Sequence, residues 1–243
     1  MYRELDPAKT LKTIEKLQNR INERFPDSSL AKVCQELKEV ASTSQQKAEW
    51  IQKPNIPLRI GIGFLIALGV AGLIFTFTRL NLSIGQIGLA EFAQLLEASV
   101  NDLLLIGAAF FFLTNIETRI KRARALEDLH ELRAVAHVID MHQLTKDPSR
   151  ITGAEMGIMT PSSPRSNLTV YELTRYLDYC SEMLSLTGKI AALYAQYLPD
   201  AIVLDMVNDI ETLTSGLSRK IWQKIIILQR LITKETENNS LQF

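Results

Sequence analysis

The sequence predicts an all-α integral membrane protein, in which a two-span transmembrane hairpin joins a cytoplasmic helical bundle with a coiled-coil-like stalk. Apolar residues concentrate between Pro57 and Leu113, although the whole 243-residue chain is 47% hydrophobic and balances 27 basic against 27 acidic residues. On both sides of this region apolar residues recur at helical three-four spacing, and no alternating pattern typical of a strand occurs. A net charge of zero gives no sign of nucleic-acid binding, and none is expected.

The first span is expected at residues 57–79. The 19 uncharged residues between Arg59 and Arg79 cover about 28 Å as a helix, close to the thickness of the hydrocarbon core. Small side chains repeat at every fourth position, which lets helix backbones approach closely in a membrane. They predict packing against the second span or, equally, against another copy of the chain. The helix-packing residues are Gly63, Ala67 and Ala71.

The second span is expected at residues 98–118. Its apolar run, from Leu103 to Leu113, is too short to cross alone, so it borrows polar residues at its ends. At 100° per residue these polar residues share one helix stripe with apolar ones. In an oligomeric ring, acidic rings separated by hydrophobic constrictions would suit a cation pathway. Alternatively, both acids only reach the headgroups at opposite ends. The pore-lining candidates are Ser99, Asp102, Ile106, Ala109, Leu113 and Glu117.

Basic residues set the orientation of the hairpin. The predicted external loop at 80–97, which includes an amphipathic helix, contains no Lys or Arg. Four basic residues follow the second span directly, and the positive-inside rule therefore places both termini in the cytoplasm. The expected location is the bacterial inner membrane, with multiple spans. The four residues are Arg119, Lys121, Arg122 and Arg124.

Four cytoplasmic segments flank the spans. Residues 1–56 predict a helical hairpin that begins at Asp6-Pro7, a good N-cap and first-turn pair. Residues 119–146 predict an uninterrupted stalk helix, and residues 147–168, with three prolines, predict a linker. Residues 169–243 predict a second helical hairpin that opens on a Thr169–Glu172 capping box. Cys34 and Cys180 each fall on an apolar helix face and are expected as buried thiols.

The stalk carries all three histidines of the chain. His130 and His137 lie two turns apart, about 10 Å, so one helix cannot bring both to a single metal ion. We therefore expect a polar stalk face, made of His130, Arg133, His137 and Asp140. No metal, cofactor or catalytic residue is predicted.

Arg124 and His130 are spaced as in the Arg-x(4–6)-His pattern of HEPN-type ribonucleases, which they resemble in this respect. Ala125 stands where that pattern usually has a polar residue. This spacing supports a membrane-bound HEPN-like ribonuclease only as the weakest of three hypotheses.

The favoured hypothesis is an oligomeric two-span inner-membrane protein that acts as an ion channel, pore or channel regulator through its second span and stalk. Its layout is broadly similar to that of the two-transmembrane effectors of bacterial defence systems. The alternative is a membrane-anchored scaffold or protein-interaction module without transport activity. The expected partners are the lipid bilayer, further copies of the chain and, under the alternative, a cytoplasmic protein.

Overall fold

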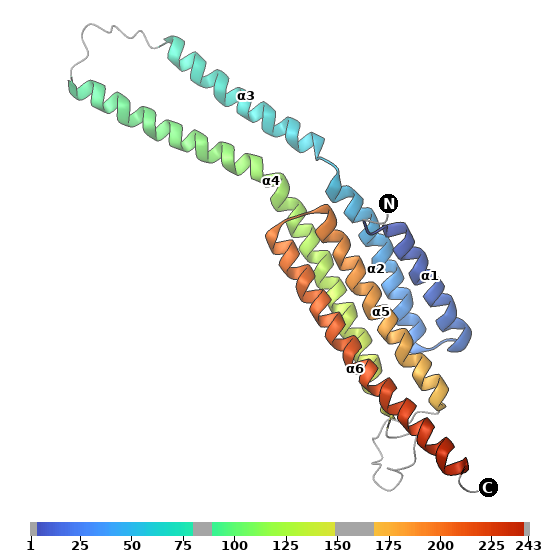
Figure 1. Cartoon of the computed structure of the whole chain (residues 1–243). Coiled ribbons are helices and arrows are strands. Elements are labelled where there is room, and N and C mark those ends of the chain that lie inside the picture. The colour runs from blue at the N-terminus through green and yellow to red at the C-terminus, as the bar shows by residue number, and fades with distance from the viewer. Residues whose placement is uncertain (1–3, 80–88, 149–167, 241–243) are drawn as a thin grey trace. The chain divides into compact units, whose positions relative to one another are not determined.

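The computed structural model describes residues 4–79, 89–148 and 168–240. Within these ranges all regular secondary structure is helical and no strand is present, which confirms the all-α prediction. The helices in chain order are α1 (Pro7–Arg24), α2 (Ser29–Gln52), α3 (Ile56–Arg79), α4 (Leu89–Leu144), α5 (Val170–Tyr197) and α6 (Ala201–Ser240) (Figure 1).

The helices form two compact units. The first, called the bundle here, combines Met1–Gln52 with Arg124–Phe243, and the second, called the hairpin, is Lys53–Ala123. Helix α4 contributes its first part to the hairpin and its last part, from Arg124, to the bundle.

Two of the bundle helices begin where the sequence predicts, because their caps satisfy backbone N–H groups that have no partner inside the helix. The Asp6 carboxylate accepts hydrogen bonds from the N–H groups of Ala8 and Lys9 at 3.0 and 3.2 Å, and Pro7 opens α1. Thr169 and Glu172 form the reciprocal capping box of α5. Both capping predictions are confirmed.

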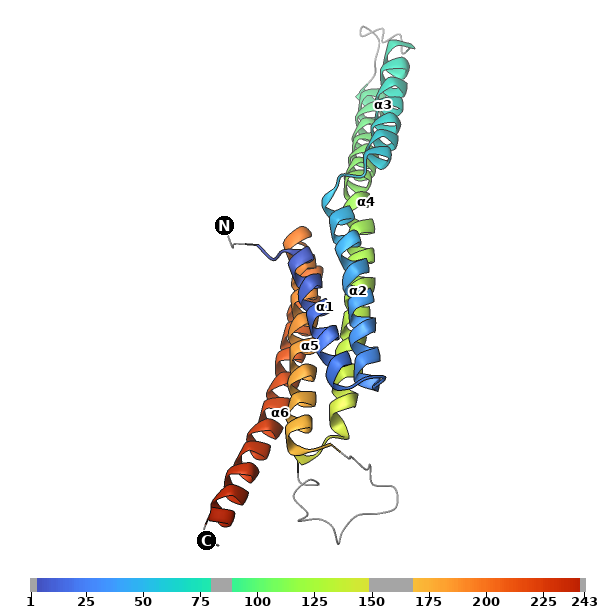
Figure 2. The ribbon, with the colours of Figure 1, turned by 90° about the vertical axis from the view of Figure 1, so that its right-hand side faces the viewer.

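Helix α5 lies at the centre of the bundle, where it packs against α1, α2 and α6 (Figure 2). Its predicted apolar stripe is buried, including Leu177, Leu184 and Tyr194. Buried residues extend well beyond that stripe, to Tyr179 and Thr187, because α5 has neighbours on several sides rather than one.

The apolar stripes of α1 and α6 are buried as predicted. Ile14, Leu17 and Ile21 of α1 are fully buried. The buried positions of the predicted α6 stripe are Val203, Ile210, Leu217, Ile221, Ile225 and Leu228.

Both cysteines are unpaired and buried, as expected. Burial raises the pKa of the Cys34 thiol to about 12 and does the same for Cys180. The reactive thiolate is therefore suppressed at neutral pH.

The hairpin exposes large apolar side chains. Phe64 of α3 is 67% exposed, and Leu103 and Phe111 of α4 are 73% and 71% exposed. By length and hydropathy, one described helix, α4 from Leu103 onward, is long and apolar enough to cross a membrane, and Ile56–Gly72 is a shorter apolar helix.

The predicted helix-packing residues of α3 are exposed in the structure. A Cβ atom added at Gly63, or at Gly107 of α4, would meet no atom within 4 Å, and Ala67 and Ala71 are exposed. One of the two expectations for the small-residue face of α3 was close packing against the second span. The structure does not show such an approach at Gly63 or Gly107.

Candidate functional site

The base of the hairpin is held by the carboxylate of Glu117. It accepts hydrogen bonds from Arg59 Nε at 2.7 Å and from the backbone N–H of Asn55 at 3.1 Å, and it pairs with Lys121 Nζ at 2.9 Å. Lys121 also donates to the Lys53 carbonyl at 2.8 Å. These contacts join the start of α3 to α4.

This pairing changes the interpretation of the predicted pore stripe. The Glu117 side chain is only 13% exposed and has two cations of its own chain as partners. Ile106 and Ala109 are exposed on the hairpin, whereas Leu113 is half-buried. The side chains of Ser99 and Asp102 lie outside the described residues. Glu117, the one acid of the stripe whose side chain is described, therefore links α3 to α4 through its ion pairs and is not free to line a pore.

The two residues of the nuclease-like spacing are not brought together. Six positions along one helix turn the side chain by about 240°, so Arg124 and His130 point to different sides of α4. The Arg124 guanidinium stacks on the Trp50 ring at 4.3 Å, while His130 is exposed.

The predicted polar stalk face divides into two parts. His130, Arg133 and His137 are exposed, whereas Asp140 is half-buried. The Asp140 carboxylate accepts a hydrogen bond from the Gln143 side chain at 2.6 Å.

Gln143 in turn links α4 to α6. Its backbone carbonyl and its side-chain oxygen each accept a hydrogen bond from Lys224 Nζ at 2.7 Å. Burial lowers the pKa of Lys224, which indicates how far this ammonium is withdrawn from water.

A buried carboxylate, Asp128, connects three helices of the bundle. Only 5% of its side chain is exposed. It accepts a hydrogen bond from the Tyr194 hydroxyl of α5 at 3.0 Å and forms an ion pair with Lys47 of α2. The hydrogen bond that the Lys47 ammonium donates to Asp128 raises the pKa of Lys47, and burial raises the pKa of Tyr194.

Asp128 is not among the predicted site residues, although the sequence pattern contains a signal for it. Asp128 lies on the same face of α4 as the buried residues Ala125, Leu132 and Ile139. A buried charge requires a partner, but the pattern alone cannot name that partner on α2 or α5.

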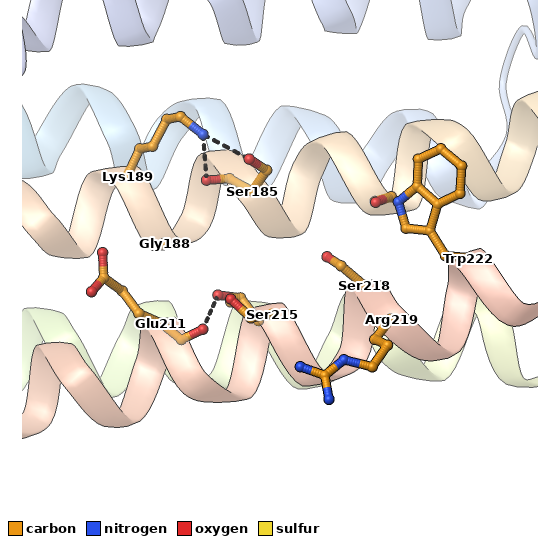
Figure 3. A pocket seen from close by; sticks show the side chains of 10 residues that line it. Ser185, Gly188, Lys189, Glu211, Ser215, Ser218, Arg219 and Trp222 are labelled. Carbon is orange, nitrogen blue, oxygen red and sulfur yellow. Dashed lines mark hydrogen bonds between the residues drawn. The ribbon is translucent and has the colours of Figure 1, made fainter.

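A groove of about 760 Å³ lies between α5 and α6 and is called the α5–α6 groove here. Figure 3 shows its two walls and the side chains along them. The α5 wall is Ser181, Ser185, Gly188 and Lys189, and the α6 wall is Glu211, Thr214, Ser215, Ser218, Arg219 and Trp222.

Small residues give this groove its depth. At Gly188 an added Cβ would lie 3.1 Å from the Thr214 hydroxyl, so glycine allows the two helices to approach closely there. Between this contact and Trp222 the groove is lined by the short side chains of Ser185, Ser215 and Ser218 (Figure 3). Trp222, which is 55% exposed, stands at one end of the groove (Figure 3).

The chemistry of the groove suits binding of a partner. Its rim carries the cations Lys189 and Arg219 against one acid, Glu211, and its serines offer hydroxyl groups. Lys189 Nζ already donates to the Ser185 hydroxyl at 2.7 Å. Among the described residues there is no group of three or more His, Cys, Asp and Glu side chains placed to hold a metal ion.

Comparison with protein-family models, with curated proteins and with solved structures finds no match for the chain.

We expect Asp128→Ala to lower the free energy of unfolding by about 2 kcal/mol, because it leaves the buried Tyr194 hydroxyl without its acceptor, whereas the Lys47 ammonium is 44% exposed and is solvated instead. Tyr194→Phe removes one hydrogen bond and should cost about 1 kcal/mol. The measurement is denaturant unfolding of the purified full chain in detergent. Glu131→Ala, an exposed change one turn away on α4, is the matched control and should stay within about 0.5 kcal/mol of the wild type. An Asp128→Ala value as small as that of the control would contradict the assignment.

Proposed function

We propose that this chain is a membrane-anchored protein-interaction module. The hairpin crosses the bacterial inner membrane, and the bundle binds a protein partner through the α5–α6 groove on the cytoplasmic side. The observation that carries the proposal is the contrast between the two units: the bundle has a closed apolar core, whereas the hairpin exposes its largest apolar side chains.

The exposed apolar surface of the hairpin is unfavourable in water and has to be buried against another apolar phase or surface. Burial of one large apolar side chain is worth about 1.5–3 kcal/mol, so leaving Phe64, Leu103 and Phe111 in water would be costly. Contiguous apolar patches of this kind mark interaction with a membrane or another protein. Helices satisfy their own backbone hydrogen bonds, as a segment in lipid must. A bilayer is the cover that fits two adjacent apolar helices with few charges between them.

The charged residues support an orientation with both termini inside. Basic residues gather at the base of the hairpin and just beyond it, at Arg59, Lys121 and Arg124. Trp50, on which Arg124 stacks, is a residue type enriched at membrane interfaces. Positive residues on this side favour its retention in the cytoplasm.

The α5–α6 groove supports binding of a helical segment of a partner protein. Two antiparallel helices with small residues along their shared surface offer a channel into which the ridge of a third helix fits. Trp222 provides an exposed aromatic anchor, a residue type that dominates binding energy at many interfaces. The excess of Lys189 and Arg219 over Glu211 favours a segment that carries carboxylates.

An ion pathway formed by α4 helices of several copies is the second candidate, because Ile106 and Ala109 are exposed on the hairpin. The pairing of Glu117 with Arg59 and Lys121 weighs against it. An acidic ring at this position would first require these contacts to break.

Membrane anchoring predicts that the chain stays in the membrane fraction after carbonate extraction at high pH and is released by detergent. The native thiols are buried, so single cysteines can report the topology. In intact spheroplasts an impermeant maleimide should label Glu97→Cys, and it should label Asp205→Cys only after lysis. Release by carbonate would refute the proposed membrane anchor. Equal labelling of both variants before lysis would refute the proposed orientation.

Planar-bilayer recording separates the interaction module from the ion pathway. We expect no conductance from the purified wild type, and equal silence from Asp102→Asn and Glu117→Gln. A cation current in the wild type that either substitution reduces would establish the ion pathway in place of the module.

The groove predicts a specific contact in the cell. A photo-reactive amino acid at Ser218, inside the α5–α6 groove, should yield one adduct of discrete mass with another protein, and the same group at Asp205 on α6 should not. Ser185→Trp, which fills the groove, should abolish the adduct without changing the level of the chain in the membrane. Adducts of equal yield from both positions, or an adduct that persists with Ser185→Trp, would rule out the groove as the binding surface.

A further inference from the structure

The last part of α4 is apolar on two faces, and only one of them is used by the bundle. Leu132, Ala136 and Ile139 are buried against the other bundle helices. On the opposite side, Met141 is 67% exposed and Leu144 is 62% exposed. An exposed pair of this size at the end of a helix that already has a buried face needs a separate explanation.

Glu131, Arg133 and Val138 are also exposed in this part of α4, but five of the exposed positions follow a heptad. They are spaced by four, three, four and three residues, which keeps them on one narrow stripe of the helix. We call this set the α4 stripe; it consists of His130, Ala134, His137, Met141 and Leu144. All five side chains are exposed, and none of them belongs to the α5–α6 groove.

We propose that the α4 stripe is the contact between two copies of this chain, which pair α4 against α4 in parallel and in register. A heptad spacing is the pattern by which one helix packs along another, and Ala134, Met141 and Leu144 are the small and apolar members of the stripe. The inference rests on the proposed function in one respect. Copies anchored by the same hairpin in one membrane share their orientation, and this makes the pairing parallel.

The stripe is self-complementary, as a twofold contact between identical chains requires. In a parallel, in-register pair each residue faces its own counterpart. Glu127, the exposed residue that continues this spacing before His130, would face its own counterpart, so the contact is limited to the five residues of the stripe. Arg133 and Asp140 lie to the side, so within the stripe no two acidic or two Lys/Arg side chains face each other. Ala134 is small enough for the helices to approach, and Met141 and Leu144 supply the apolar contact at the end of α4.

Disulfide cross-linking of the full chain in its native membranes tests the pairing. The wild type is the baseline, because Cys34 and Cys180 are buried. Under mild oxidation Ala134→Cys and Met141→Cys should each give a product of twice the monomer mass, since each new thiol faces its own counterpart. Asp205→Cys, exposed on α6, is the matched control and should remain monomeric.

A second variant measures the contact without a cross-link. Met141→Lys places a like charge in both copies and should halve the mass of the detergent-solubilised protein, from dimer to monomer. Its helix content by circular dichroism should match that of the wild type, because the Met141 side chain contributes little to the core.

Three results would overturn the pairing. Equal cross-linking of Asp205→Cys would show random collision in the membrane. Stripe thiols that neither cross-link nor react with maleimide would show that another segment or protein covers the stripe. A cross-link between Ala134→Cys in one copy and Leu144→Cys in another, with no product from either alone, would show an antiparallel arrangement. Carbonate extraction of the same variants reports separately whether the membrane anchor has failed.

Discussion

Helix α4 has to satisfy two different surroundings along one uninterrupted run of backbone, from Leu89 to Leu144. In the hairpin, apolar side chains such as Leu103 and Phe111 are exposed around its surface. From Arg124 onward the helix has a buried face that packs in the bundle, and its backbone hydrogen bonds need no change between the two parts. Only the side chains change, so a single helix carries both a candidate anchor and a core element. The remaining bundle helices depend on this element, because α2, α5 and α6 each have a polar contact with it.

The contact at Asp128 shows how α4 fixes its neighbours. Apolar side chains pack well in several registers, whereas a buried carboxylate is satisfied only when its donors arrive at the correct positions. Tyr194 of α5 and Lys47 of α2 both contact Asp128, so a shift of either helix by one turn would remove one of the two partners of this buried carboxylate. Burying an ion pair adds little net stability, since the cost of desolvation offsets the attraction. Its effect is to select one arrangement of α2, α4 and α5 among those that the apolar stripes would allow.

The sequence predicts local structure well because local structure depends on nearby residues. The caps at Asp6 and Thr169 and the stripe of α6 follow from short-range hydrogen bonding and helical spacing. Contacts between distant segments do not follow in this way. Glu117 looked like an intramembrane acid, and only the fold places Arg59, 58 positions away, beside its carboxylate. The sequence does not predict the α5–α6 groove for the same reason. Ser185 and Ser218 are ordinary polar residues in the sequence, and only the close approach of the two helices at Gly188 places them in one groove.

The two proposed contact surfaces lie on different helices but share a link through α6. Trp222 stands at one end of the groove, and two positions along the same helix the ammonium of Lys224 binds Gln143 of α4. Gln143 is adjacent to Leu144, the last residue of the α4 stripe. Lys224 is partly withdrawn from water, so its two hydrogen bonds hold α6 against α4 more firmly than an exposed pair would. A partner that binds beside Trp222 therefore contacts α6, the helix that Lys224 ties to Gln143 next to the end of the α4 stripe. Recruitment through the α5–α6 groove and self-association through the α4 stripe would then use surfaces that share no residue, and neither surface has to be dismantled for the other to be occupied.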